Sequence, residues 1–140
     1  MSGLPDGYYQ LEAQIGYKLR LANQRHLEIF SRLMTDFTPT QFSVLVRLHD
    51  VGAVSQNQLG RLVAMDAATT KGVVDRLADK GLVKSQPDGT DMRRLMISLT
   101  DQGVTALAAL VPIAHRITAE TTAKLTKREA ARLCALLDKL

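Results

Sequence analysis

The chain has 140 residues, of which 46% are hydrophobic and 23% charged, a composition typical of one globular domain and unlike that of a disordered chain. No window approaches the ~18 to 20 consecutive apolar residues of a membrane span. The polar start also lacks the order of a signal peptide, so we expect a cytoplasmic protein that does not bind membranes. The net charge of +4 suits a polyanionic partner only weakly, because acidic and basic residues are interspersed.

The first predicted elements are helices, and capping boxes mark where several of them begin. An apolar stripe at spacings of three and four predicts one long amphipathic helix over about residues 8–34. In a capping box, a Ser or Thr side chain binds a free N–H of the new helix and a Glu or Gln three residues later reciprocates. Three segments match this pattern: Thr38 to Gln41, Ser55 to Gln58 and Thr126 to Glu129.

The segment after the first box predicts a helix-turn-helix. Apolar spacing gives helices over about 39–49, 56–63 and 67–80, and Gly81 ends the last of them. The second and third of these helices are separated only by the turn at residues 64–66, which is the arrangement of a helix-turn-helix.

A β-hairpin and two further helices complete the chain. Residues 82–85 and 94–99 flank a turn rich in Asp and Gly and predict two paired strands. A fifth helix follows from about residue 101, with a kink or break expected at Pro112, and a sixth ends near Leu140. The fifth helix has two apolar stripes, more than one small domain can cover, and this predicts a homodimer.

Several short strings now bear on the family, and their order and spacing are informative together. They are Thr38-Pro39-Thr40-Gln41, Ser55-Gln56 with Leu59, Val74-Asp75-Arg76-Leu77, Lys80-Gly81-Leu82-Val83, and Asp88 to Arg93 followed by Leu99-Thr100 and Gly103. Over essentially its whole length the chain resembles the MarR family of multiple-antibiotic-resistance regulators. One departure is Met92, which stands where the family usually has the first of two wing arginines.

The resemblance implies a mainly α fold with a small β-hairpin, that is, a winged helix-turn-helix. A single domain over residues 1–140 would contain the winged part at about 38–100 and dimerisation helices at about 8–34 and 101–140. It also implies a homodimer that binds double-stranded DNA with a recognition helix in the major groove and a wing at the minor groove. A small aromatic or phenolic acid that releases the DNA is a further implied partner.

The candidate DNA-binding residues are polar or small residues at helix starts, on the fourth helix and in the hairpin. Small residues and hydroxyls let the backbone approach base edges, and Lys or Arg can reach guanine or phosphate. Free N–H groups at helix starts attract phosphate, and Asp91 is placed to orient Arg93. The set is Thr40, Gln41, Ser55, Gln56, Ala68, Thr69, Thr70, Lys71, Arg76, Asp91, Arg93 and Arg94.

The candidate effector site combines aromatic residues with cationic or hydrogen-bonding ones, as an aromatic acid requires. It lies between the predicted dimerisation helices and the DNA-reading segment. Its residues are Tyr17, Arg20, His26 and Phe30 on the first helix and Phe42 and His49 on the second.

No catalytic motif, phosphate loop or cofactor motif is present in the sequence, so we expect neither an enzyme nor a cofactor. The three histidines share no metal-ligand spacing, and Cys134 in an apolar run is expected to be a buried, inert thiol. Two alternatives remain open at this point. One is a winged-helix module that binds protein instead of DNA, and the other is a metal- or redox-responsive regulator of the same fold.

Overall fold

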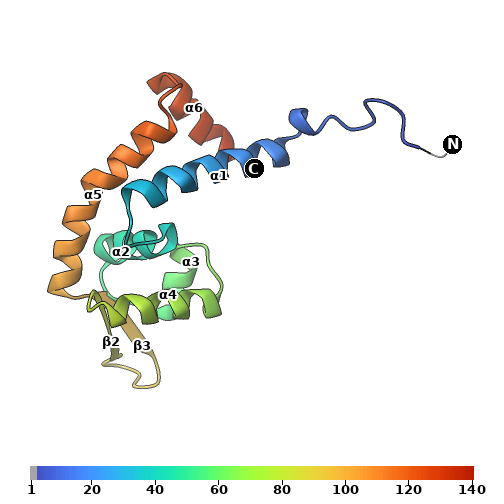
Figure 1. The fold of residues 1–140 in the computed structure, drawn as a ribbon. Helices are drawn as coiled ribbons and strands as arrows, with labels where there is room; N and C mark the ends of the chain where they lie inside the picture. Colours follow the sequence, from blue (N-terminus) through green and yellow to red (C-terminus); the bar gives the residue numbers. More distant parts are fainter. Residues whose placement is uncertain (1–2) are drawn as a thin grey trace. The chain divides into compact units, whose positions relative to one another are not determined.

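The computed structural model describes residues 3–140, which form six α-helices and a small antiparallel sheet (Figure 1). The described chain divides into two compact units. Unit 1 consists of residues 3–33 and Arg116–Leu140, and unit 2 is Met34–His115. The mainly α winged helix-turn-helix that the sequence predicts is therefore present, with the winged part in unit 2.

Unit 2 contains three complete helices, each with a side-chain cap at its start. They are α2 (Pro39–Val51), α3 (Gln56–Leu62) and α4 (Ala67–Asp79). The capping boxes of α2 and α3 are confirmed: Thr38 Oγ1 accepts from the N–H of Gln41 at 3.2 Å, and Ser55 Oγ accepts from the N–H of Gln58 at 3.2 Å. The third predicted box, Thr126 with Glu129, caps α6 (Lys127–Leu137) of unit 1. All three helix starts are where the sequence pattern put them.

The turn between α3 and α4 contains two features that the pattern did not reveal. Ala64 has a φ of 55°, a left-handed conformation that is uncommon for a residue other than glycine. Asp66 caps α4, because its Oδ1 accepts from the N–H of Thr69 at 2.7 Å. This hydrogen bond lowers the pKa of the Asp66 carboxyl below its ordinary value. The negative charge of the Asp66 carboxylate is also stabilised by the positive end of the helix dipole.

The sheet has three strands in the order β1-β3-β2, all antiparallel. The predicted hairpin is confirmed as β2 (Val83–Pro87) and β3 (Leu95–Leu99). β1 (Val54–Ser55) was not predicted, because two residues are too few to show an alternating pattern. It pairs with the inner strand β3, which leaves Pro87 on the edge strand β2, where a missing N–H is tolerated.

The core of unit 2 joins the three helices to this sheet. Its largest fully buried side chains are Met34 just before α2, Leu45 and Leu48 from α2, Leu59 from α3, Leu77 from α4 and Ile97 from β3. Each of these helices therefore turns its apolar stripe toward the same interior. The opposite, polar face of α4 is left exposed to solvent.

The start of α5 (Asp101–Thr121) is fixed to the end of α4 by a tight junction. Thr100 Oγ1 donates to the carbonyl of Gly81 at 2.6 Å and accepts from the N–H of Gly103 at 3.0 Å. A Cβ atom on Gly103 would lie 2.1 Å from the carbonyl oxygen of Leu82, so only glycine fits there. Gly81, the predicted stop of α4, has a φ of 76° and needs its conformational freedom as well.

α5 runs through Pro112 as one helix, so the predicted break is not observed. Its first part, up to His115, belongs to unit 2. The reason is that Leu107 and Leu110 on this part are buried. Val104 and Val111 stay exposed, so the uncovered apolar face is narrower than the two predicted stripes.

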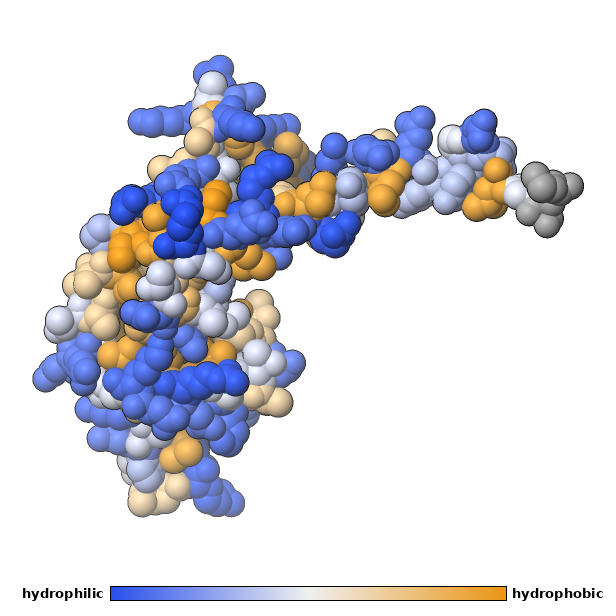
Figure 2. Space-filling view, viewed as in Figure 1, coloured by the Kyte–Doolittle hydropathy of each residue, from blue (hydrophilic) through white to orange (hydrophobic). Residues whose placement is uncertain are grey.

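Unit 1 consists of the N-terminal segment, α1 (Ile15–Leu33), the end of α5 and α6. The prediction of helix from residue 8 is wrong, because a 3-10 turn at Leu11–Ala13 and an extended Gln14 separate that segment from α1. The Arg32–Glu120 ion pair and a hydrogen bond of 2.9 Å between His26 Nδ1 and Thr121 Oγ1 join α1 to α5. Apolar side chains remain exposed along the N-terminal segment (Figure 2).

No helix among the described residues is both long enough and apolar enough to span a bilayer.

Candidate nucleic-acid interface

The exposed face of α4 carries most of the residues predicted to contact DNA. Ala68, Thr69, Lys71 and Arg76 are all exposed, as expected once the apolar stripe faces the core. Lys71 Nζ donates to Asp75 Oδ2 at 2.8 Å, one turn further along the helix. The N-terminal half of this face is therefore small and hydroxyl-bearing, and its middle is charged.

Thr70 does not belong to this face, and the prediction that it contacts DNA is wrong. Its side chain is 0% exposed, and its Oγ1 donates to the carbonyl of Asp66 at 2.7 Å. It also lies against Gly60 of α3, where an added Cβ would come within 3.1 Å of the Thr70 hydroxyl. Thr70 therefore packs the two helices of the motif together instead of facing outward.

A depression of about 510 Å³ lies between the start of α2 and the outer face of α4. Thr40, Thr69 and Arg76 line it, and all three are exposed. Gln41 also lines it but is only 7% exposed, and its Oε1 already accepts from the N–H of Thr38 at 3.2 Å. Hydroxyl groups and one guanidinium at a helix start suit a phosphate, so Thr40 and Arg76 are better placed for that contact than the Gln41 side chain.

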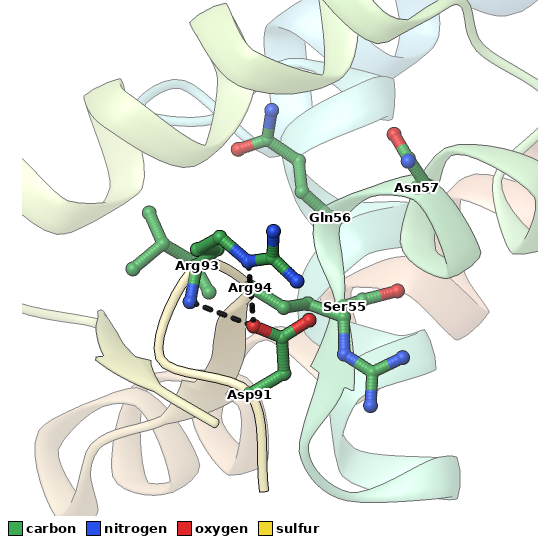
Figure 3. A pocket seen from close by; sticks show the side chains of 7 residues that line it. Ser55, Gln56, Asn57, Asp91, Arg93 and Arg94 are labelled. Atoms are coloured by element: carbon green, nitrogen blue, oxygen red, sulfur yellow. Dashed lines mark hydrogen bonds and ion pairs between the residues drawn. The ribbon is translucent and has the colours of Figure 1, made fainter. Parts of the chain in front are cut away.

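A second depression, of about 320 Å³, lies between the start of α3 and the wing, the loop that joins β2 to β3 (Figure 3). Gln56 and Asn57 face it from α3, and Arg93 and Arg94 face it from the wing. Ser55 is nearly buried, and its hydroxyl is used by the capping contacts with Gln58. Capping is thus the role that the structure gives Ser55.

The wing arginines are held by two different carboxylates. Asp91 Oδ1 accepts from the backbone N–H of Arg93 at 3.0 Å and from its Nε at 3.3 Å, so the predicted contact between these residues is present (Figure 3). The Arg93 side chain is nevertheless 93% exposed. Arg94 is bound by Asp88, with its Nε 2.9 Å from Asp88 Oδ2. Arg93 is therefore oriented outward, whereas Arg94 is tied into the base of the wing.

The contact between Asp88 and Arg94 changes the pKa of both groups. Hydrogen bonding from the Arg94 guanidinium, supported by the N–H of Thr90, holds the pKa of the Asp88 carboxyl below its ordinary value. The same contact raises the pKa of Arg94. The Asp88 side chain is only 14% exposed, so this pair is shielded more than the Asp91–Arg93 pair.

Comparison with known proteins identifies the family. Residues 37–95 match the MarR family. The transcriptional repressor NicR of Pseudomonas putida is 37% identical over 94% of this chain and 85% of its own length. The chain belongs to the MarR family. This confirms the resemblance seen in the sequence strings, and the family and its relatives are transcriptional regulators.

Two solved MarR-type structures are similar over nearly the whole chain. A probable transcriptional regulator from Pseudomonas aeruginosa is 45% identical, with a TM-score of 0.90, over 93% of this chain and 98% of that one. BpsR of Bordetella bronchiseptica, whose DNA binding is regulated by 6-hydroxynicotinic acid, is 36% identical with a TM-score of 0.91. The coverage is 95% of this chain and 96% of BpsR.

This MarR-family chain departs from the usual wing at Met92, which is 73% exposed beside Arg93. The tip of the wing therefore presents one apolar and one cationic side chain instead of two cations. Arg93 keeps the position of the second arginine.

The predicted effector residues fall in both units. Tyr17, Arg20, His26 and Phe30 belong to α1 of unit 1, whereas Phe42 and His49 belong to α2 of unit 2. Within α1 they form two pairs. The Arg20 guanidinium lies 5.4 Å from the centre of the Tyr17 ring, and the ring centres of His26 and Phe30 are 6.3 Å apart, edge to face.

Among the predicted residues of unit 1, Arg20 alone lines a depression of about 740 Å³ on this unit. The other residues that line it lie on the same face of α1, and they were not predicted because they are mostly polar. They are Asn23, Gln24, Leu27, Glu28, Ser31 and Arg32. Their spacing of three and four residues was the available signal. Phe30, in contrast, is buried, and His26 is bound to Thr121.

The residues considered for metal or redox chemistry give a mixed result. The structure brings no three of the described His, Cys, Asp or Glu side chains into a possible metal site. Cys134 is exposed in the single chain, so one protomer does not bury the thiol as the sequence predicts. The reason is that α6 buries none of its residues within this chain.

Proposed function

We propose that this protein is a ligand-responsive repressor that binds a palindromic DNA operator as a homodimer through α4 and the wing. The observation that carries the proposal is the joint placement of the α4 face and Arg93. Unit 2 exposes Ala68, Thr69, Lys71 and Arg76 on one helix, and Asp91 directs Arg93 outward from the wing. Such a helix fits the major groove, and an extended arginine fits the narrower minor groove.

The depression between α2 and α4 supports this orientation of the DNA. Thr40 and Arg76 border the exposed α4 face and offer a hydroxyl and a guanidinium to a backbone phosphate. Phosphate contacts fix the register of a protein on the duplex, and base-edge contacts then read the sequence. We assign the first role to Thr40 and Arg76, and the second to Ala68, Thr69 and Lys71.

Arg93→Ala tests the wing in a titration of labelled operator DNA at several salt concentrations. The affinity should fall by about tenfold, and the salt slope should decrease by about 1 per protomer, because one cationic contact is lost. Arg128→Ala is the matched control, since Arg128 is an exposed arginine of α6 in unit 1. Equal effects of the two substitutions would contradict the wing assignment. If the unmodified protein showed no preference for any DNA sequence, the alternative of a winged-helix module that binds protein would be favoured.

The effector is proposed to be a small aromatic acid of the 6-hydroxynicotinic acid type. The similarity to BpsR suggests this class, and the Arg20–Tyr17 pair on α1 offers a cation and an aromatic face for it. Adding 6-hydroxynicotinic acid should lower the affinity of the protein for the operator. Saturating operator should lower the affinity for 6-hydroxynicotinic acid by the same factor. Calorimetric titration with and without operator measures this, and equal ligand affinity in both titrations would exclude release by this compound.

A further inference from the structure

The charges of unit 2 are balanced, which is unusual for a unit that binds DNA. Between Met34 and His115 there are eight Lys or Arg residues and eight Asp or Glu residues. The net charge of +4 therefore lies entirely outside this unit. Because phosphate attraction supplies most of the affinity for arbitrary sequences, a neutral reading unit limits binding to DNA without the operator.

Three predicted DNA-facing cations each have a carboxylate partner on their own element. Arg93 is bound by Asp91, Arg94 by Asp88, and Lys71 by Asp75. The two wing carboxylates also accept backbone hydrogen bonds, Asp91 from Arg93 and Asp88 from Thr90, and so they shape the loop. The Asp75 carboxylate instead accepts from the Lys71 side chain and not from the backbone of a loop. Asp75 therefore needs a different explanation from Asp88 and Asp91.

The stability of α4 does not supply that explanation. The side chains of Lys71 and Asp75 are 65% and 59% exposed, and exposed pairs of this kind contribute little to the free energy of unfolding. Lysine before the acid at this spacing is also the less favourable order along a helix. An isosteric Asp75→Asn protein should therefore fold normally.

We infer that Asp75 is a specificity-determining residue for DNA binding, which selects the operator by weakening contacts to all other sequences. Its carboxylate holds Lys71 along the helix and repels the phosphates that flank the groove. In the major groove of the operator, the same carboxylate can accept a hydrogen bond from cytosine N4, and Lys71 can reach guanine. The repulsion thus acts on any duplex, and only a matching base pair compensates for it. This inference rests on the proposed function.

The test compares an operator duplex, selected from random sequences with the unmodified protein, with a shuffled duplex of the same length and composition. Asp75→Asn should bind the shuffled duplex about threefold or more tightly, with a steeper salt slope, because two repulsive charges are removed per dimer. Affinity for the operator should rise less or fall, so the ratio of the two affinities decreases. Asp79→Asn, which removes the same charge at the end of α4 away from the base-reading end, should change the ratio less.

Two results with the Asp75→Asn protein alone would overturn the inference, and a third comes from comparison with Asp79→Asn. One is an unchanged affinity and salt slope for the shuffled duplex, and the other is an equal gain for both duplexes. Failure of the proposed function gives a different result, because selection with the unmodified protein would then yield no preferred duplex. If Asp75→Asn and Asp79→Asn changed the ratio of the two affinities equally, the effect would come from net charge alone. This result would also contradict the inference.

Discussion

Gly103 shows how one residue sets the junction between the end of α4 and the start of α5. Gly103→Ala would place a Cβ atom 2.1 Å from the Leu82 carbonyl oxygen and 3.0 Å from its carbon, both in the backbone. The backbone must then shift and strain the hydrogen bonds of Thr100. We expect a loss of about 3 kcal/mol in the free energy of unfolding, measured with urea.

Gly16→Ala is the control for that measurement. Gly16 also lies near the start of a helix, but an added Cβ there meets no atom within 4 Å. Stability should stay the same or rise slightly, because alanine favours helix. Equal losses of unfolding free energy in both proteins would show that the close approach of residue 103 to the Leu82 carbonyl does not affect stability.

Several single residues were predictable from the sequence, and others were not. The caps Thr38, Ser55 and Thr126 follow from local chemistry, because donor and acceptor lie three residues apart. Thr70 was misplaced although its spacing from Val74 and Leu77 matches the buried stripe, because its hydroxyl suggested an exposed position. Asp75 was not among the predicted residues, because the role now proposed for it depends on the groups that surround its carboxylate in the folded protein.

The wing is an element whose geometry should depend on pH through Asp88. Because its pKa is lowered in the folded state, the Asp88–Arg94 contact contributes stability above the ordinary value of 3.8, and this contribution is lost as the pH falls through the lower folded-state pKa. Asp88→Asn should therefore be less stable than the unmodified protein at pH 7. The difference should disappear in acid below the folded-state pKa.

The partner residue supplies the control for this prediction. In an Arg94→Met background, Asp88→Asn removes a carboxylate that has already lost the guanidinium hydrogen bond that chiefly lowers its pKa. The pH-dependent difference should then shrink strongly, which thermal unfolding at several pH values can measure. A difference of the same size in both backgrounds would mean that Thr90, and not Arg94, fixes the carboxylate.

Elements with a strong local period were predictable, and elements defined by tertiary pairing were not. The helices α2, α3 and α4 and the hairpin follow from apolar spacing and turn residues. β1 exists only because β3 offers it a partner. The N-terminal segment continues the apolar stripe of α1 but forms only a 3-10 turn before Ile15, because Gln14 is extended and interrupts the helix.

The whole molecule is proposed to be a homodimer, because a large apolar surface stays uncovered in one chain. Exposed apolar residues lie on α5 and α6: Val104, Val111, Leu133, Leu136 and Leu137. Pairing around a twofold axis is the commonest way to cover such a surface. Equilibrium sedimentation should give about 31 kDa, twice the chain mass of 15.4 kDa. A monomer at micromolar concentration would contradict the dimer.

A twofold dimer with one α4 in each protomer must read an inverted repeat, and this links the proposed assembly to the proposed function. Hydroxyl-radical footprinting of the selected operator tests both at once. We predict two protected half-sites with centres about 10 bp apart, flanked by minor-groove protection that disappears in Arg93→Ala. Protection without any repeated half-site, or protection that Arg93→Ala leaves unchanged, would contradict the central claim that α4 and the wing bind DNA.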